Sequence, residues 1–171
     1  TIQRRHQKMI EESPCTVLDE KTREALCIAA LRIIKQADYA SAATVEFLLD
    51  KDKNYYFIET NTRIQVEHPV TEMVTGHDLI KWQLKVANGD KIDIKQKNIT
   101  HQGAAIECRI NAEDPARNFA PCPGTVERFI APGGPGIRID THISQGCRIS
   151  PNYDSMICKL IAYNRNREEA I

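Results

Sequence analysis

Two acidic residues, Glu46 and Glu59, stand at matching distances from a polar turn at residues 50–54. The runs on both sides of that turn are mainly apolar and aromatic, which predicts an antiparallel hairpin. Counting outward from a pair of Asp50 with Tyr55 places the two glutamates directly opposite each other. Directly opposed Cβ atoms lie about 4.5–5.5 Å apart, and like charges at that distance repel. A hard divalent cation with oxygen ligands would relieve this repulsion.

Polar residues continue at every second position beyond Glu59, as one face of an extended strand would present them. The row consists of Asn61, Arg63, Gln65 and Glu67. Glu46, Glu59 and Asn61 could supply oxygens to Mg²⁺, which also uses substrate phosphates. The Arg63 fork suits a small oxyanion such as a carboxylate or bicarbonate. Glu67 directly precedes a predicted helix start and is a candidate general base, although the nearby guanidinium would favour its charged form.

A second interpretation of this row stays open on the residues alone. Alternating polar positions are typical of the solvated face of a half-exposed antiparallel sheet. Two observations favour a site instead. The predicted pairing puts the apolar Leu48 and Phe57 beside the glutamates, where water would screen the repulsion poorly, and no Lys occurs in the row.

Helical and strand patterns surround the hairpin. Apolar residues recur at helical spacing over 19–37, which predicts an amphipathic helix packed on a core. His68 and Pro69 predict a second helix start, and residues 78–89 begin with a capping Asp and end with Gly. A polar stretch at 89–103 predicts a boundary. Beyond it, strand-like alternation occurs at 104–110, 126–130, 137–143 and 156–163, and a helix start is expected at 166–171.

Composition excludes several functional classes. Lys and Arg total 23 and Asp and Glu total 23, so the chain lacks the positive surplus that nucleic-acid binders and anionic-membrane binders use. No apolar run approaches the length of a membrane span, and we expect a cytoplasmic protein. The six cysteines show neither zinc-ligand spacing nor a need for disulfides, so we expect buried free thiols.

Three weaker signals have ordinary structural explanations. The basic run at 4–8 is short and lies in a neutral chain, which favours a solvated face over a nucleic-acid site. The glycine-rich segment 131–136 lacks the Lys and Ser/Thr of a phosphate loop and predicts a turn. Glu107 and Arg109 share the polar face of one strand, and on spacing alone they could form a surface ion pair of little energetic weight.

Residues 59–72, Glu-Thr-Asn-Thr-Arg-Ile-Gln-Val-Glu-His-Pro-Val-Thr-Glu, resemble the signature of biotin carboxylases, which are ATP-grasp ligases. The resemblance extends to residues 3–8 (Gln-Arg-Arg-His-Gln-Lys), 107–115 (Glu-Cys-Arg-Ile-Asn-Ala-Glu-Asp-Pro) and 153–156 (Tyr-Asp-Ser-Met). It therefore covers nearly the whole chain. The wording around Arg109 resembles the biotin carboxylase component of bacterial acetyl-CoA carboxylase.

This resemblance implies a reaction and a set of site residues. Bicarbonate would attack the γ-phosphate of ATP to give carboxyphosphate and ADP, and the carboxyl group would pass to biotin. Glu46, Glu59 and Asn61 would hold two Mg²⁺ or Mn²⁺ ions, and Glu67 would remove the proton of bicarbonate. Bicarbonate would be bound by Arg63, Gln65, Lys8 and the backbone of Val66. Arg109 would stabilise charge on biotin, while Gln3, His6 and Leu48 would line the nucleotide pocket.

The expected fold class is α+β, a truncated piece of a longer protein. Residues 1–101 would form the C-terminal part of an ATP-grasp core, and residues 102–171 an incomplete, mostly β, biotin carboxylase C-terminal domain. The resemblance implies as partners the biotin carboxyl carrier protein, the carboxyltransferase subunits of fatty acid synthesis and a second copy of the full-length protein. We expect the isolated chain to be inactive. Another biotin-dependent carboxylase, a more distant ATP-grasp ligase and a non-catalytic dimerisation module remain alternatives.

Overall fold

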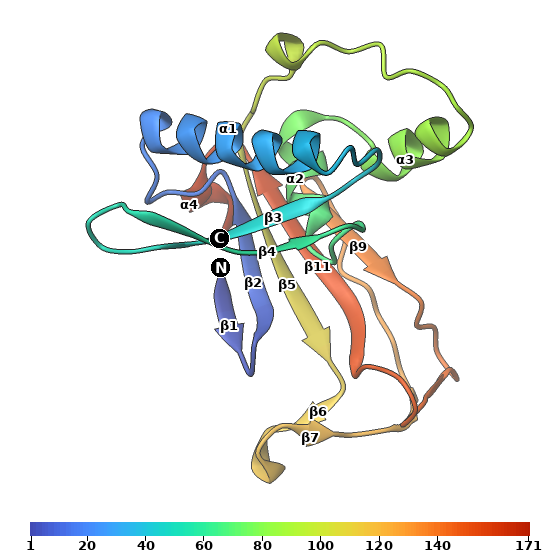
Figure 1. Cartoon of the computed structure of the whole chain (residues 1–171). Coiled ribbons are helices and arrows are strands. Elements are labelled where there is room, and N and C mark those ends of the chain that lie inside the picture. The colour runs from blue at the N-terminus through green and yellow to red at the C-terminus, as the bar shows by residue number, and fades with distance from the viewer. The chain divides into compact units, whose positions relative to one another are not determined.

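The computed structural model describes all 171 residues and divides them into two compact units. One unit consists of residues 14–101, and the other combines residues 1–13 with residues 102–171. Helices and antiparallel strands both occur, so the expected mixture of α and β structure is confirmed (Figure 1). The first thirteen residues join the later unit because their strand pairs with one beyond residue 102. The domain division after residue 101, predicted from the polar stretch at 89–103 and named by the family resemblance, stays a prediction.

The unit of residues 14–101 begins with helix α1, Glu20–Gln36. The Asp19 carboxylate caps it by accepting a 2.8 Å hydrogen bond from the Thr22 backbone N–H. The helix ends with Asp38 in the left-handed conformation, at a φ of 49°. The predicted helix is confirmed, but its burial is smaller than expected. None of its residues is fully buried, and Leu31 is 52% exposed.

Helix α1 is followed by the predicted hairpin, strands β3 (Thr44–Leu49) and β4 (Tyr55–Asn61). Two short helices come next, α2 (His68–Thr75) and α3 (Leu79–Ala87), and a single 3₁₀ turn, η1, covers Gln96–Asn98. Both helices were predicted. Pro69 lies in the first turn of α2, while Gly76 closes it at a φ of 70°. Val70 and Val74 lie one turn apart on α2 and are both buried, so they form its core-facing side.

The other unit is built on a five-stranded sheet in the order β1-β2-β5-β11-β9, with every neighbouring pair antiparallel. The strands are Ile2–Arg4, Gln7–Ser13, Ala104–Asn111, Met156–Asn164 and Ile137–Thr141, in that order across the sheet (Figure 1). Ala105 and Ile161, in the central strands, have no exposed surface. Helix α4, Arg167–Ala170, packs on β5 and β11, and Asn166 caps it as predicted.

Two small ladders and a 3₁₀ turn complete this unit. Strands β6 (Glu113–Asp114) and β7 (Ala120–Pro121) flank the turn η2 (Pro115–Arg117). Strand β8 (Gly124–Thr125) pairs with β10 (Arg148–Ile149). The prediction of a strand at 126–130 is wrong, because strand β8 ends at Thr125. Val126 still exchanges backbone hydrogen bonds with Gly146 and Cys147, but residues 127–130 form no strand. The β1–β2 hairpin was not foreseen, since its turn residues, Arg5 and His6, carry no turn signal.

All six cysteines are free, as expected, but they are not all buried. Cys158 is buried, Cys108 and Cys147 are partly exposed, and the others (Cys15, Cys27 and Cys122) are exposed. The expectation of buried thiols is wrong for those three, because two lie in loops and one on the outer side of α1. No helix of the chain combines the length and the apolar character that a membrane crossing requires.

Candidate functional site

Glu46 and Glu59 lie directly opposite each other in the β3–β4 hairpin, as the sequence predicted. The pairing nearer the turn is different from the predicted one. Leu49 faces Tyr55, Phe47 faces Phe57, and Ile58 is left over as a bulge. The loop is therefore one residue longer than predicted, and the bulge compensates before the two glutamates are reached.

The bulge also changes which side chains accompany the acids. Phe57 lies opposite Phe47 and packs edge-on against it, with the ring centroids 6.3 Å apart. By strand alternation this aromatic pair lies on the face opposite to Glu46. Tyr56 takes the place that we expected for Phe57, across from Leu48, and Leu48 is 63% exposed. The acids therefore do not have the apolar surroundings that we expected on both strands.

Side-chain amides bridge the two glutamates. The Asn61 Nδ2 group donates to Glu59 Oε1 at 2.8 Å and to Glu46 Oε1 at 3.2 Å. Gln65 Nε2 donates to the same Glu46 oxygen at 3.2 Å. The Asn61 amide therefore joins the two acids, and its hydrogens together with those of Gln65 offset part of the like-charge repulsion.

The donor set fits a hard divalent cation. Glu46 is half-buried and Glu59 is exposed, and Mg²⁺ is commonly held by one or two carboxylates together with waters and substrate phosphates. No group of three or more His, Cys, Asp or Glu side chains in the chain has metal-binding geometry, so the protein oxygens here would be a partial shell. Asn61 directs its side-chain nitrogen at the two acids, so its oxygen could bind a cation at that place only after the amide group flips by 180°.

Arg63 extends the polar network, although the strand does not continue that far. Strand β4 ends at Asn61, so the extended row to Glu67 is wrong, because residues 62–67 turn into helix α2. Arg63 Nη1 donates to Gln65 Oε1 at 3.1 Å, and its Nη2 donates to Asn61 Oδ1 at 3.4 Å. The guanidinium is exposed. The chain thus places an accessible planar cation beside the two acids and their amides.

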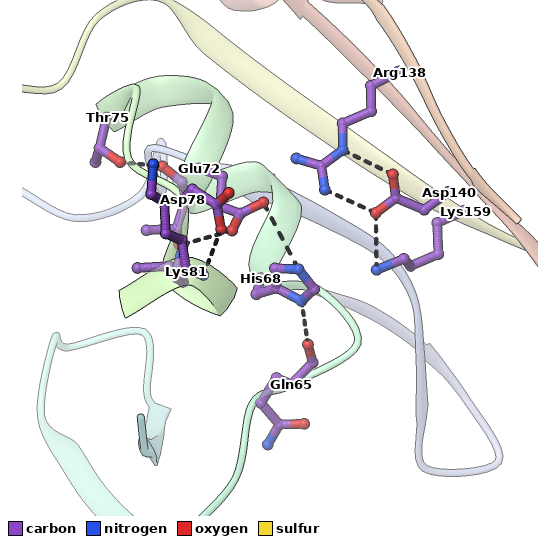
Figure 2. A network of polar contacts seen from close by, with 11 residues as sticks. Gln65, His68, Glu72, Thr75, Asp78, Lys81, Arg138, Asp140 and Lys159 are labelled. Carbon is purple, nitrogen blue, oxygen red and sulfur yellow. Dashed lines mark hydrogen bonds and ion pairs between the residues drawn. The ribbon is translucent and has the colours of Figure 1, made fainter. Parts of the chain in front are cut away.

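Helix α2 fixes the residues that follow Arg63. Gln65 and Glu67 are 8% and 9% exposed, and Glu67 occupies the N-cap position of α2 without a side-chain capping bond. His68 Nδ1 lies 2.7 Å from the Gln65 carbonyl oxygen, and His68 Nε2 lies 3.7 Å from Glu72 Oε2. Figure 2 shows His68 between these two partners. His68 therefore sets the helix start, as expected, and holds the backbone of Gln65 in place.

The remaining predicted site residues belong to the unit that contains residues 1–13 and 102–171. Gln3 pairs with Lys8 in the β1–β2 hairpin, and His6 lies in its turn. Gln3 and His6 are exposed, while Lys8 is half-buried. Arg109 lies on β5, the strand next to β2.

Glu107 and Arg109 are not a surface pair, because Glu107 is only 1% exposed. Opposite Arg109 on β11 lies Lys159, which bonds Asp140 at 3.4 Å. Arg138 also holds Asp140, through bonds of 2.8 and 2.9 Å (Figure 2). Burial alone would raise the pKa of Asp140, but the Arg138 hydrogen bonds and the two cations lower it below its ordinary value.

The unit of residues 14–101 therefore connects five of the predicted site residues through side-chain hydrogen bonds, namely Glu46, Glu59, Asn61, Arg63 and Gln65. Val66 and Glu67 follow directly at the start of α2. Sequence reasoning missed that Tyr56, and not Phe57, lies across from Leu48. Only the bulge at Ile58 reveals it, and no residue pattern marked that bulge.

Two protein-family models match successive parts of the chain. Residues 1–95 match the family model described as the ATP-binding domain of the carbamoyl-phosphate synthase L chain. Residues 107–171 match the biotin carboxylase C-terminal domain.

The chain is similar along its whole length to curated proteins. It is 54% identical over 172 residues to biotin carboxylase 1 of Bacillus subtilis, covering 100% of this chain and 38% of that relative. It is 49% identical to a pyruvate carboxylase subunit of Methanothermobacter thermautotrophicus, covering 100% of this chain and 35% of that protein.

Solved structures give the same result. The biotin carboxylase domain dimer of Hydrogenobacter thermophilus 2-oxoglutarate carboxylase, in complex with MgADP, ADP and bicarbonate, matches with a TM-score of 0.95 and 50% identity. That match covers 99% of this chain and 37% of the solved chain. The chain therefore belongs to the biotin carboxylase family, and it spans about 38% of the length of the curated biotin carboxylases that it matches.

Proposed function

We propose that the protein containing this chain carboxylates biotin with bicarbonate in an ATP-dependent reaction. The observation that carries the proposal is the connected network in which Asn61 joins Glu46 to Glu59 and Arg63 contacts both Asn61 and Gln65. It combines oxygen donors for a cation with an exposed guanidinium for an oxyanion. The MgADP and bicarbonate bound by the Hydrogenobacter relative support the same ligand classes.

Each residue of the network has a proposed task. Glu46 and Glu59, with Asn61 beside them, would hold the Mg²⁺ or Mn²⁺ ions that neutralise the phosphates of ATP. Arg63, the Gln65 side chain and the Val66 backbone would orient bicarbonate, to which Lys8 also contributes by resemblance. Glu67 would accept the proton of bicarbonate. An oxygen of bicarbonate then bonds to the γ-phosphorus as its bond to ADP breaks.

The second half of the proposed reaction uses residues of the other unit. Carboxyphosphate would break down to CO₂ and phosphate, and the ureido nitrogen of biotin would bond to that CO₂ as its proton passes to the phosphate. Arg109 would stabilise the negative charge that develops on the ureido oxygen. Gln3 and His6 would contact the nucleotide, and Leu48 of the hairpin would do so too. These assignments follow the family resemblance residue by residue.

The proposed setting is the first half-reaction of acetyl-CoA carboxylase in fatty acid synthesis. Its partners would be the biotin carboxyl carrier protein, the carboxyltransferase subunits and a second copy of the protein. The relative from Methanothermobacter belongs to a pyruvate carboxylase, which supports a pyruvate-directed carboxylase as a second candidate. The decisive measurement is which acyl substrate the purified complex carboxylates.

Metal-dependent nucleotide binding tests the site. The protein that carries this chain with the rest of the carboxylase should bind MgADP in calorimetry. Glu59→Gln, which removes one of two carboxylates, should weaken binding by about 10-fold or more. Glu20→Gln changes a glutamate that is 83% exposed on α1 and is the matched control. Equal affinities for Glu59→Gln and the control would remove the metal role from this pair.

Product formation separates the enzyme from a dimerisation module. A biotin carboxylase should release ADP in a reaction that requires both bicarbonate and biotin. A protein that dimerises but releases no ADP under those conditions would contradict the proposed activity.

A further inference from the structure

The β1–β2 hairpin turns through a backbone conformation that its residues do not favour. Arg5 and His6 form a two-residue loop with φ values of 50° and 65°. Loops of this kind usually contain Asn and Gly, because other residues meet steric resistance at positive φ. Such a turn persists where the surrounding structure holds it.

Contacts of the side chains in and beside the turn stabilise its conformation. Arg4 forms an ion pair with Glu113, and its guanidinium lies 4.0 Å from the centroid of the Phe119 ring. Arg5 Nη2 donates to the Asn118 carbonyl at 2.7 Å. Asn118 and Phe119 also have positive φ, 53° and 55°, so two strained segments are fastened to each other.

Glu113 joins this contact to two further segments. It accepts hydrogen bonds from Asn111 Nδ2 at 3.0 Å and from Ser155 Oγ at 2.8 Å, in addition to Arg4. Asn111 is the last residue of β5, and Ser155 directly precedes β11. The side chain is only 11% exposed. Burial alone would raise its pKa, but these hydrogen bonds and the Arg4 charge lower it, so the carboxylate stays charged at neutral pH.

A second contact links the same segments. Gln7, which pairs with Arg4 at the base of the turn, donates to Asp154 Oδ2 at 3.3 Å. Arg4 on β1 and Gln7 on β2 thus connect both strands of the hairpin to the segments that follow β5 and precede β11.

We propose that Glu113 and Arg4 are positioning residues, which fix the β1–β2 hairpin and its Gln3, His6 and Lys8 side chains relative to β5 and Arg109. Gln3 pairs with Lys8 one position from the Arg4–Gln7 pair, so a tilt of the tip displaces both side chains. The functional consequence rests on the proposed function, whereas the anchoring itself concerns the fold alone.

The test uses Glu113→Gln in the whole protein that carries this chain. It removes the negative charge that pairs with Arg4 and keeps nearly the same volume. The matched control is Glu169→Gln, which breaks the more exposed Arg165–Glu169 pair of the same unit. We expect Glu113→Gln to raise the KM for bicarbonate about 10-fold, because charge-assisted bonds are lost. Amides of residues 1–13 should exchange hydrogen faster, while those of α1 are unchanged.

Two outcomes overturn the proposal. One is unchanged exchange in residues 1–13, and the other is a fall in kcat with the KM for bicarbonate at the wild-type value. If Glu113→Gln does not fold, Arg4→Lys serves instead, since it keeps the charge but loses the planar stack on Phe119. It should give a smaller change in the same direction. Wild-type protein without carboxylation activity would refute the proposed function, and hydrogen exchange would still decide the anchoring.

Discussion

Replacing Gly136 by alanine should destabilise the protein strongly, because the backbone of β11 leaves no room for a side chain. Gly136 has a φ of 78°, and an added Cβ would lie 2.2 Å from the Tyr163 carbonyl oxygen. The Gly136 carbonyl in turn accepts a 2.8 Å hydrogen bond from the Tyr163 N–H. This close approach explains the glycine at the end of segment 131–136, which resembles a phosphate loop only superficially.

The size of the effect follows from two separate costs. Left-handed backbone costs a residue with a Cβ about 1–2 kcal/mol. Forcing the two backbones apart adds about 1–3 kcal/mol, the usual cost of overpacking. The free energy of unfolding should therefore fall by about 2–5 kcal/mol in total for Gly136→Ala.

Two other glycines separate these costs experimentally. Gly146 has a φ of 84° with nothing within 4 Å of an added Cβ, so Gly146→Ala should show only the conformational cost of about 1–2 kcal/mol. Gly133 has neither constraint, and Gly133→Ala should change stability by less than about 1 kcal/mol. Urea denaturation of the three variants gives the comparison. If Gly136→Ala costs no more than Gly146→Ala, the close approach to Tyr163 does not limit this position.

Three further predictions concern both units. Asp38 follows α1 at a φ of 49° and places a negative charge at the C-terminus of the helix. Asp38→Gly should therefore raise the free energy of unfolding, measured by urea denaturation, by about 0.5–1 kcal/mol. A loss of stability would contradict this. Gln65→Leu should lower the free energy of unfolding by about 1–3 kcal/mol, since Glu46 loses a donor and Arg63 an acceptor at a buried position. Unchanged stability would show that these hydrogen bonds contribute nothing. The pKa of Asp140 is lowered in the folded protein, so its ionised side chain stabilises the fold above the unfolded pKa of about 3.9. That contribution disappears as the pH falls through the folded pKa. Asp140→Asn should therefore reduce the free energy of unfolding at pH 7 but match wild type in acid denaturation below the folded pKa.

The regular elements could be predicted because their patterns are local. Apolar spacing identified α1, capping residues and Pro69 identified α2 and α3, and strand alternation identified the long strands β5 and β11. The β1–β2 turn could not be predicted, because its conformation is held by contacts with residues more than a hundred positions away.

The hairpin shows why the site was only partly predictable. The Asp50 carboxylate accepts from the backbone N–H groups of Asp52 and Asn54, at 2.9 and 2.8 Å, and so shapes a loop one residue longer than expected. Lys53 completes that loop at a φ of 63°, which no glycine announces. Facing acids were predicted correctly, whereas the joint use of Lys8 and Arg109 in one reaction rests on resemblance and stays a prediction.

The bulged residue Ile58 has a consequence for how related chains are recognised. Removing it would leave Glu59 directly after Phe57, and in a regular ladder that residue would still face Glu46. The two acids can therefore stay partners when the number of residues between them changes by one. A search pattern that demands a fixed separation between the glutamates would discard chains that hold the same pair without the bulge.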